Sequence, residues 1–189
     1  RLLAAWEANE DATVYTLKLR DNVTWNNGDK CTAEHIAWNL QRWTEGDVEG
    51  NSMAARVSSL TKEGVEIVDA TTIRLNLTKP DITIIAGMAD YPGLIVHPDF
   101  GGDLSANPIG TGPYNMVEFE VEVGARYEKR DPAEWYGTAE WGEVKLDSIV
   151  YTDYGNDPAP ETAAFESGEI DANYETFPAQ AELMDGLGF

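Results

Sequence analysis

The sequence predicts a mixed α/β fold, and three observations carry that prediction. Residues 15–43 run from an alternating strand pattern through a turn into a helical pattern, in the letters YTLKLRDNVTWNNGDKCTAEHIAWNLQRW. Residues 65–77 and 114–129 each have the pattern of a β-hairpin. Residues 147–176 read as strand, helix and strand. Segments of period two and of period 3.6 that alternate along one chain are typical of α/β domains.

The first predicted strand alternates apolar and polar residues. Tyr15, Leu17 and Leu19 share one side of it, which is expected of a half-buried strand. A turn at residues 26–29 follows, because glycine accepts a positive φ and asparagine tolerates one. Thr32 is then placed to cap a helix, and the apolar stripe of that helix consists of Ala33, Ile36, Leu40 and Trp43.

The middle of the chain predicts short elements. The polar, glycine-broken connector at 46–59 has room for one short helix. A hairpin follows, with Val65 and Ile67 on one arm and residues 73–77 on the other. Residues 82–98 are largely apolar but are interrupted by glycine and proline, so we expect a short helix that leads to a buried strand.

A glycine-rich turn opens the second half. Gly110, Thr111 and Gly112 resemble a phosphate-binding loop, but Pro113 removes a backbone N–H that such a loop needs, and a strand rather than a helix follows. We therefore predict a turn that feeds a hairpin of residues 114–121 and 124–129. Further on, we predict a strand around Ile149 and Tyr151, a helix stopped by Gly168, and a last strand at 171–176.

Charge excludes two classes of partner. The chain has 13 Lys and Arg against 34 Asp and Glu, a formal net charge of −21. Such a chain is repelled by phosphate backbones and by anionic bilayers, so we expect no nucleic-acid partner and no membrane docking. The acidity fits either an ordinary solvated surface or a saline habitat. The sequence shows neither a signal-peptide pattern nor a long apolar run, as expected of a mature product or a trimmed piece.

Residue patterns do not predict a catalytic or metal site. Cys31 is the single cysteine, so it forms no internal disulfide, and no His or Asn pattern near it would activate it as a nucleophile. His35 and His97 are far apart in the sequence and lack the spacing of zinc ligands. We expect no cofactor and no metal. An acidic cluster comprises Glu161, Glu166, Glu169 and Asp171. A solvated helix face explains this cluster better than an acid–base pair does.

Four blocks follow one another along the chain. The first contains WEANED, VYTLKLRDNVTWNNGD and TAEHIAWNLQR, within residues 6–42. The others are DATTIRLNL at 69–77, NPIGTGPY at 107–114 with a trailing EWYG, and LDSIVY with TAAFESGEID within 146–171. Taken together, these blocks resemble the solute-binding proteins of peptide-type ABC transporters, the family that binds dipeptides, oligopeptides and nickel.

The resemblance implies a fold and a function. It implies a mixed-sheet lobe of the type II periplasmic-binding-protein kind, truncated before the second lobe. Residues 1–104 would form the outer subdomain of the first lobe, and residues 105–189 part of its main sheet. It also implies binding of a peptide or other small solute, and delivery to an ABC permease from the periplasm or the cell exterior, without catalysis.

The resemblance also implies where the solute lies. In the family the segment after GEID lines the cleft, which here corresponds to Asn173, Tyr174 and Glu175. Tyr174 is the first choice, because an aromatic ring packs against a peptide while its hydroxyl donates a hydrogen bond; sheet packing is the other explanation of this residue. Met53 and Tyr91 are weaker candidates. In nickel binders a cationic residue lies near the position of Tyr91, and its absence here argues against a nickel chelate.

Two classes of function stay open from the sequence. The alternatives to a peptide-binding protein are a secreted carboxylate-dependent hydrolase and a binder of a non-peptide solute such as a nickel chelate or an oligosaccharide. The solute itself is not identified, because in the family the groups that pair with peptide termini come largely from the second lobe. We also expect self-association through the lobe face around Tyr174 and Phe177.

Overall fold

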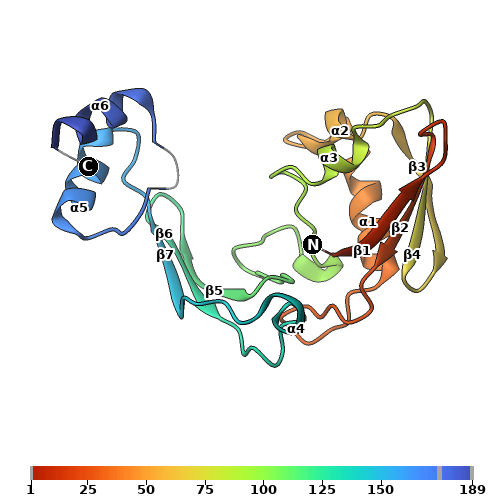
Figure 1. The fold of residues 1–189 in the computed structure, drawn as a ribbon, viewed down its shortest axis with the longest axis horizontal. Helices are drawn as coiled ribbons and strands as arrows, with labels where there is room; N and C mark the ends of the chain where they lie inside the picture. Colours follow the sequence, from red (N-terminus) through yellow and green to blue (C-terminus); the bar gives the residue numbers. More distant parts are fainter. Residues whose placement is uncertain (1, 174–175, 188–189) are drawn as a thin grey trace. The chain divides into compact units, whose positions relative to one another are not determined.

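The computed structural model describes residues 2–173 and 176–187, and these form two compact units (Figure 1). Unit 1 comprises the chain up to Asn115 together with Lys129–Asp147. Unit 2 comprises Met116–Glu128 and the chain from Ser148 onward. The compact units thus do not divide at residue 104, and the predicted assignment of 1–104 to a family subdomain stays a prediction.

A four-stranded antiparallel sheet forms the frame of unit 1. Its strands are β1 (Leu3–Ala8), β2 (Val14–Leu19), β3 (Leu60–Asp69) and β4 (Thr72–Leu77), in the spatial order β1-β2-β4-β3. The register pairs Tyr15 with Leu75 and Leu17 with Ile73. All four of these side chains are buried, as the alternation predicted for the first strand and for the hairpin.

Helix α1 (Ala33–Trp43) packs on this sheet against β3 and β4 (Figure 1). It begins where predicted, since the Thr32 side chain accepts a hydrogen bond from the backbone N–H of His35. The predicted stripe is confirmed as core by the burial of Ala33, Ile36, Leu40 and Trp43. Trp38 lies off the stripe and packs against Phe100, with ring centroids 6.2 Å apart.

Three short helices follow in unit 1, but the buried strand expected after the second does not form. Helix α2 (Met53–Arg56), helix α3 (Ile84–Met88) and the 3₁₀ turn η1 (Pro98–Phe100) are present, and residues 91–97 between the last two are irregular. The Asn39 side chain bonds both backbone groups of Val96, at 3.0 and 2.8 Å. The backbone N–H and C=O of Val96 therefore have hydrogen-bond partners without a neighbouring strand. A fourth short helix, α4 (Thr138–Trp141), ends unit 1.

Unit 2 is built on a three-stranded sheet with two helices. The sheet order is β5 (Tyr114–Glu120), β6 (Gly124–Lys129) and β7 (Ser148–Thr152), and the ends of β5 and β6 extend into unit 1. The predicted hairpin and the strand around Ile149 are confirmed. Gly124 is required where it stands, because a Cβ there would lie 2.1 Å from the carbonyl oxygen of Tyr151.

Helices α5 (Pro158–Ser167) and α6 (Pro178–Leu187) pack against each other in unit 2 (Figure 1). Gly168 ends α5 in the left-handed conformation, as predicted. The strand predicted at 171–176 is wrong for its described members, which are not in a strand. The chain turns back instead, because the N–H groups of Glu169 and Ile170 donate to the carbonyl of Ala164. Pro178 then starts α6, so the described residues form no strand–helix–strand unit with parallel strands.

Candidate functional site

An apolar groove of about 650 Å³ lies on unit 1. Four segments that are distant in sequence line it: the first two strands, helix α1, the segment from α3 to Ile95, and the end of α4. Among its lining residues are Leu3, Leu19, Leu40, Trp43, Met88, Tyr91, Leu94 and Trp141. Concave apolar sites of this size with few polar groups are typical of small-molecule binding. We call this site the apolar groove.

Tyr91 is the predicted site residue that lies in the apolar groove. Its side chain is 80% exposed, and its backbone N–H donates to the carboxylate of Asp90 at 2.8 Å. Arg56 donates to the same carboxylate at 2.8 Å, and this hydrogen bond lowers the pKa of Asp90. The backbone of Tyr91 is therefore held by the ion pair of Asp90 and Arg56, while its ring is accessible to a ligand.

Two charged residues stand at the groove together with an aromatic ring. The guanidinium of Arg20 donates to both carboxylate oxygens of Glu140, Nη2 to Oε1 at 3.0 Å and Nη1 to Oε2. The same guanidinium lies 5.2 Å from the centroid of the Trp141 ring. This arrangement fixes Trp141 as a wall of the groove and adds a polar, charge-neutral edge to an apolar floor.

Met53 does not line the groove. Its side chain is 2% exposed and belongs to the hydrophobic core of unit 1. A buried thioether of this kind fills core space. The family resemblance predicts Met53 near the cleft, but it does not distinguish core from surface at a single position.

The other predicted site residues belong to unit 2. Asn173 is half-buried; its Nδ2 contacts the Sδ of Met184 at 3.8 Å, and its buried Oδ1 has no hydrogen-bond partner among the described residues. Tyr174 and Glu175 lie outside the described residues. Close in sequence, Phe177 is 61% exposed and lines a separate pocket of about 410 Å³ with Phe119, Tyr151 and Tyr154. Unit 2 thus carries a small aromatic pocket, and the predicted role of residues 173–175 stays a prediction.

The four carboxylates of the acidic cluster in the second half have separate surroundings. Glu161 accepts a hydrogen bond from Gln180 at 2.8 Å, and Glu169 accepts one from the hydroxyl of Tyr154 at 3.1 Å. Glu166 and Asp171 are exposed. These carboxylates thus lie in solvent or accept hydrogen bonds from polar side chains.

Burial makes the single thiol inert. Desolvation raises the pKa of Cys31 to about 12, so the thiolate is scarce at neutral pH. Within residues 2–173 and 176–187, His, Cys, Asp and Glu side chains do not gather in threes that could hold a metal ion. None of the helices in this described part is long and apolar enough to cross a membrane.

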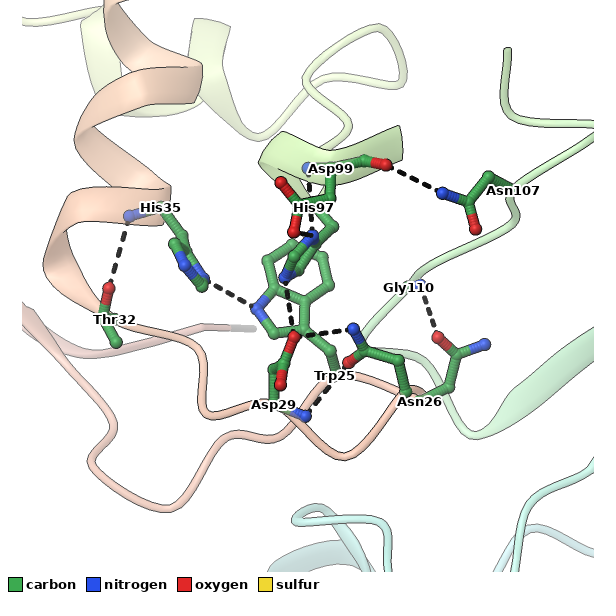
Figure 2. Close-up of polar contacts among 10 residues, drawn as sticks. Trp25, Asn26, Asp29, Thr32, His35, His97, Asp99, Asn107 and Gly110 are labelled. Atoms are coloured by element: carbon green, nitrogen blue, oxygen red, sulfur yellow. Dashed lines mark hydrogen bonds and ion pairs between the residues drawn. The ribbon is translucent and has the colours of Figure 1, made fainter. Parts of the chain in front are cut away.

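A cluster around two histidines was missed from the sequence. The rings of His35 and His97 lie with centroids 5.0 Å apart, and both contact the fully buried Trp25 (Figure 2). The distance between the two residues in the sequence does not predict that they meet. A usable signal was the apolar context of each histidine, since polar residues on buried faces require partners.

Comparisons with known proteins agree on one family. The model of the bacterial extracellular solute-binding proteins, family 5 Middle, matches residues 1–187. A probable peptide ABC transporter periplasmic-binding protein, y4tO of Sinorhizobium fredii, is 26% identical over 92% of this chain and 34% of its own length. The glutathione-binding protein GsiB of Pectobacterium atrosepticum is 24% identical over 97% of this chain and 35% of its own length.

Solved structures of the same kind share the fold. The solute-binding protein MoaA of A. tumefaciens R10, in complex with mannopinic acid, is 29% identical with a TM-score of 0.75, over 90% of this chain and 34% of that chain. The predicted periplasmic-binding-protein fold is thereby confirmed. This chain spans about a third of the length of the relatives that it matches. By its match over residues 1–187, the chain belongs to the bacterial extracellular solute-binding proteins of family 5.

Proposed function

We propose that this chain is part of the extracytoplasmic solute-binding component of an ABC importer, and that it contributes one wall of a peptide-binding site. The single observation that carries the proposal is the apolar groove with the exposed Tyr91, on a chain that matches a solute-binding family along nearly its whole length. A groove of this character buries an apolar side chain of the solute and leaves its polar backbone to other groups.

Candidate contacts are proposed for each unit separately. In unit 1, Tyr91 and Leu94 contact an apolar side chain of the solute in the groove. In unit 2, Asn173 offers its unpartnered Oδ1, and the resemblance adds Tyr174 and Glu175. Met53 is left out of the proposed set, because it is part of the core.

The proposed solute class and partners are based on what the relatives are named for. Two curated relatives are named for peptides and for glutathione, which is why a peptide is the first choice of solute. A non-peptide solute is the alternative, since the 29% identical MoaA was solved with mannopinic acid. We propose a membrane permease as the protein partner, a location outside the cytoplasm, and binding without turnover. We also keep the proposal that the exposed aromatic surface around Phe177 lets this chain self-associate.

The apolar groove is tested by a pair of matched variants. Leu94 lines the groove and is 65% exposed, whereas Ile82 is 84% exposed and lies outside it. In the natural protein that contains this chain, Leu94→Asp should weaken the binding of leucine-containing tripeptides about tenfold or more, because a charge would be desolvated by the bound side chain. Ile82→Asp should leave the affinity unchanged. Calorimetric titration in which both variants bind like the wild type would rule out the groove as the contact surface.

A further inference from the structure

Two neutral histidines join three segments of unit 1 through a buried tryptophan. The Trp25 ring lies 5.9 Å from the ring of His35 on α1 and 5.0 Å from the ring of His97, just before η1 (Figure 2). Trp25 is fully buried and His97 is 3% exposed. The chain has two histidines in all, so both of them belong to this cluster.

The hydrogen bonds determine which nitrogen of each ring carries the proton. Nε1 of Trp25 lies 3.0 Å from Nδ1 of His35, and an indole N–H only donates. The backbone N–H of Asp99 lies 3.1 Å from Nδ1 of His97, and it also only donates. Nδ1 must therefore be the acceptor in both rings, so both imidazoles are neutral with the proton on Nε2.

Protonation of either ring would break the bond that holds it. An imidazolium has N–H groups at both nitrogens, so its Nδ1 would face another donor instead of accepting from it. Two charged rings with centroids 5.0 Å apart would also repel each other. Burial and the neighbouring His97 lower the pKa of His35 below its ordinary value. The structure thus holds the neutral form of this ring.

Charged groups from the loop, from η1 and from α1 surround the cluster. On the 23–31 loop, Asp29 Oδ2 lies 3.3 Å from His97 Nε2, and in η1, Asp99 Oδ2 lies 3.9 Å from His97 Nδ1. Helix α1 contributes Glu34, whose charge acts on His35, and Arg42, which stacks over Phe100 of η1. Both carboxylates face the ring of His97. A proton on His97 would exchange the bond from the Asp99 N–H for contacts with carboxylates, and the η1 turn would lose its cap.

The segment that His97 anchors also forms part of the apolar groove. Residues 91–97 link Tyr91 and Leu94 of the groove to His97, and Asn39 holds Val96 within the segment. We propose that His35, His97 and Trp25 form an acid-sensitive latch that holds residues 91–100 in place, and with them one wall of the groove. The latch rests on the geometry of the cluster, while its effect on solute binding rests on the function proposed above.

The sign of the pH effect follows from linkage. Above the unfolded pKa of histidine, near 6.5, His35 is neutral in the folded and the unfolded chain, so it contributes no pH-dependent loss of stability. As the pH falls below that value, the unfolded chain takes up the proton first, because the folded pKa of His35 is lower. Stability is therefore present above pH 6.5 and is lost from there down to the lowered folded pKa.

The latch is tested by nitrogen NMR of the two rings and by amide hydrogen exchange, at about pH 7.5 and about pH 5. We expect both rings in the Nε2–H form at the higher pH. At the lower pH, residues 96–100 should open more often, after correction for intrinsic exchange. The expected increase is about tenfold for each pH unit between 6.5 and the lowered folded pKa of His35. An Nδ1–H tautomer at neutral pH, or unchanged opening, would overturn the latch. The tautomer measurement tests the hydrogen-bond assignment of both rings without any variant.

A double variant and a neutral probe complete the test. In H35N/H97N the Asn Oδ1 atoms can replace the two Nδ1 acceptors but do not titrate, so the pH effect on residues 96–100 should disappear. N-phenyl-1-naphthylamine, an uncharged apolar fluorophore, should bind the wild-type groove several-fold more weakly at the lower pH. Equal binding at both pH values alongside a working latch would overturn the coupling to the groove. Binding at neither pH would overturn the groove assignment instead.

Discussion

Asn39 shows how one buried polar residue replaces an element of secondary structure. It lies on the core-facing side of α1 and is fully buried. Its amide donates to the Val96 carbonyl at 2.8 Å and accepts from the Val96 N–H at 3.0 Å, as a neighbouring strand would. The same Nδ2 also donates to the His35 carbonyl at 2.9 Å. This one side chain therefore ties the groove segment to the helix that carries half of the histidine pair.

Replacement of Asn39 by Ala should lower the stability more than the small change in side-chain size suggests. The change leaves the N–H and C=O of Val96 buried without partners, so we expect the free energy of unfolding to fall by about 2–6 kcal/mol, or about 1–3 per orphaned group. Asn22→Ala is the matched control, because Asn22 is exposed, and it should change stability by less than about 0.5 kcal/mol. Urea unfolding followed by circular dichroism measures both. Equal stabilities of the two variants would show that the Val96 segment is held by other contacts.

At the scale of elements, helix α5 has both of its ends determined by sequence. Asp157 accepts the backbone N–H of Ala159 at 3.0 Å, and Pro158 occupies the first turn. Gly168 ends the helix with φ +75°, a conformation that costs residues with a Cβ. These local signals are why the end of this helix was predictable from residues near Gly168 alone.

The two glycines of unit 2 helices should respond in opposite ways to alanine. Gly168→Ala should lower the stability of unit 2 by about 1 kcal/mol, because φ there is left-handed. Gly186 lies within α6 at an ordinary φ with open space around its Cα, so Gly186→Ala should raise stability by about 0.5–1 kcal/mol. Thermal unfolding of the two variants measures the difference. A neutral Gly168→Ala would mean that the end of α5 is frayed rather than capped.

Local patterns predicted most of the elements, and long-range contacts were the part that could not be predicted. Helix α1 and both hairpins depend on residues a few positions apart, and they formed as expected. The placement of β2 beside β4 depends on burial of apolar faces from distant segments, which periodicity does not specify. The strand predicted at 171–176 does not form over its described members, and the sequence pattern did not show the turn that follows Gly168.

The candidate site was predictable in part. The family resemblance indicated Tyr91, while core periodicity indicated Leu40 and Trp43, which form part of the groove wall. Neither argument predicted that these three residues line one groove, because the groove is formed by tertiary packing of separate segments. The pairing of His35 with His97 was hidden for the same reason, since no local pattern reports a contact between a helix and a distant loop.

At the scale of the whole chain, net charge is the dominant feature. A formal charge of −21 on 189 residues opposes compaction by self-repulsion. Surface ion pairs such as Arg74 with Glu66 offset little of this, since exposed pairs contribute about 0–1 kcal/mol each. Mobile cations that screen the carboxylates should therefore matter more than any single pair.

Added salt should stabilise the chain. Screening shortens the Debye length from about 30 Å at 0.01 M to about 10 Å at 0.1 M, so repulsion among the carboxylates weakens. We expect the urea midpoint to rise between these two concentrations of NaCl, with an unchanged slope of the unfolding transition. A midpoint that falls with salt would mean that attractive ion pairs outweigh the net charge.

The proposed function is the binding of a peptide without its chemical transformation. The most direct measurement incubates the natural protein containing this chain with a defined mixture of short peptides, removes the unbound fraction, and analyses bound and free peptides by mass spectrometry. We expect a subset of peptides to be retained at one per protein, saturably, and every peptide to keep its original mass. Cleaved peptides whose appearance stops in Glu169→Gln or Glu175→Gln would contradict it in favour of a hydrolase, and retention of no peptide would contradict the assignment of peptides as the solute.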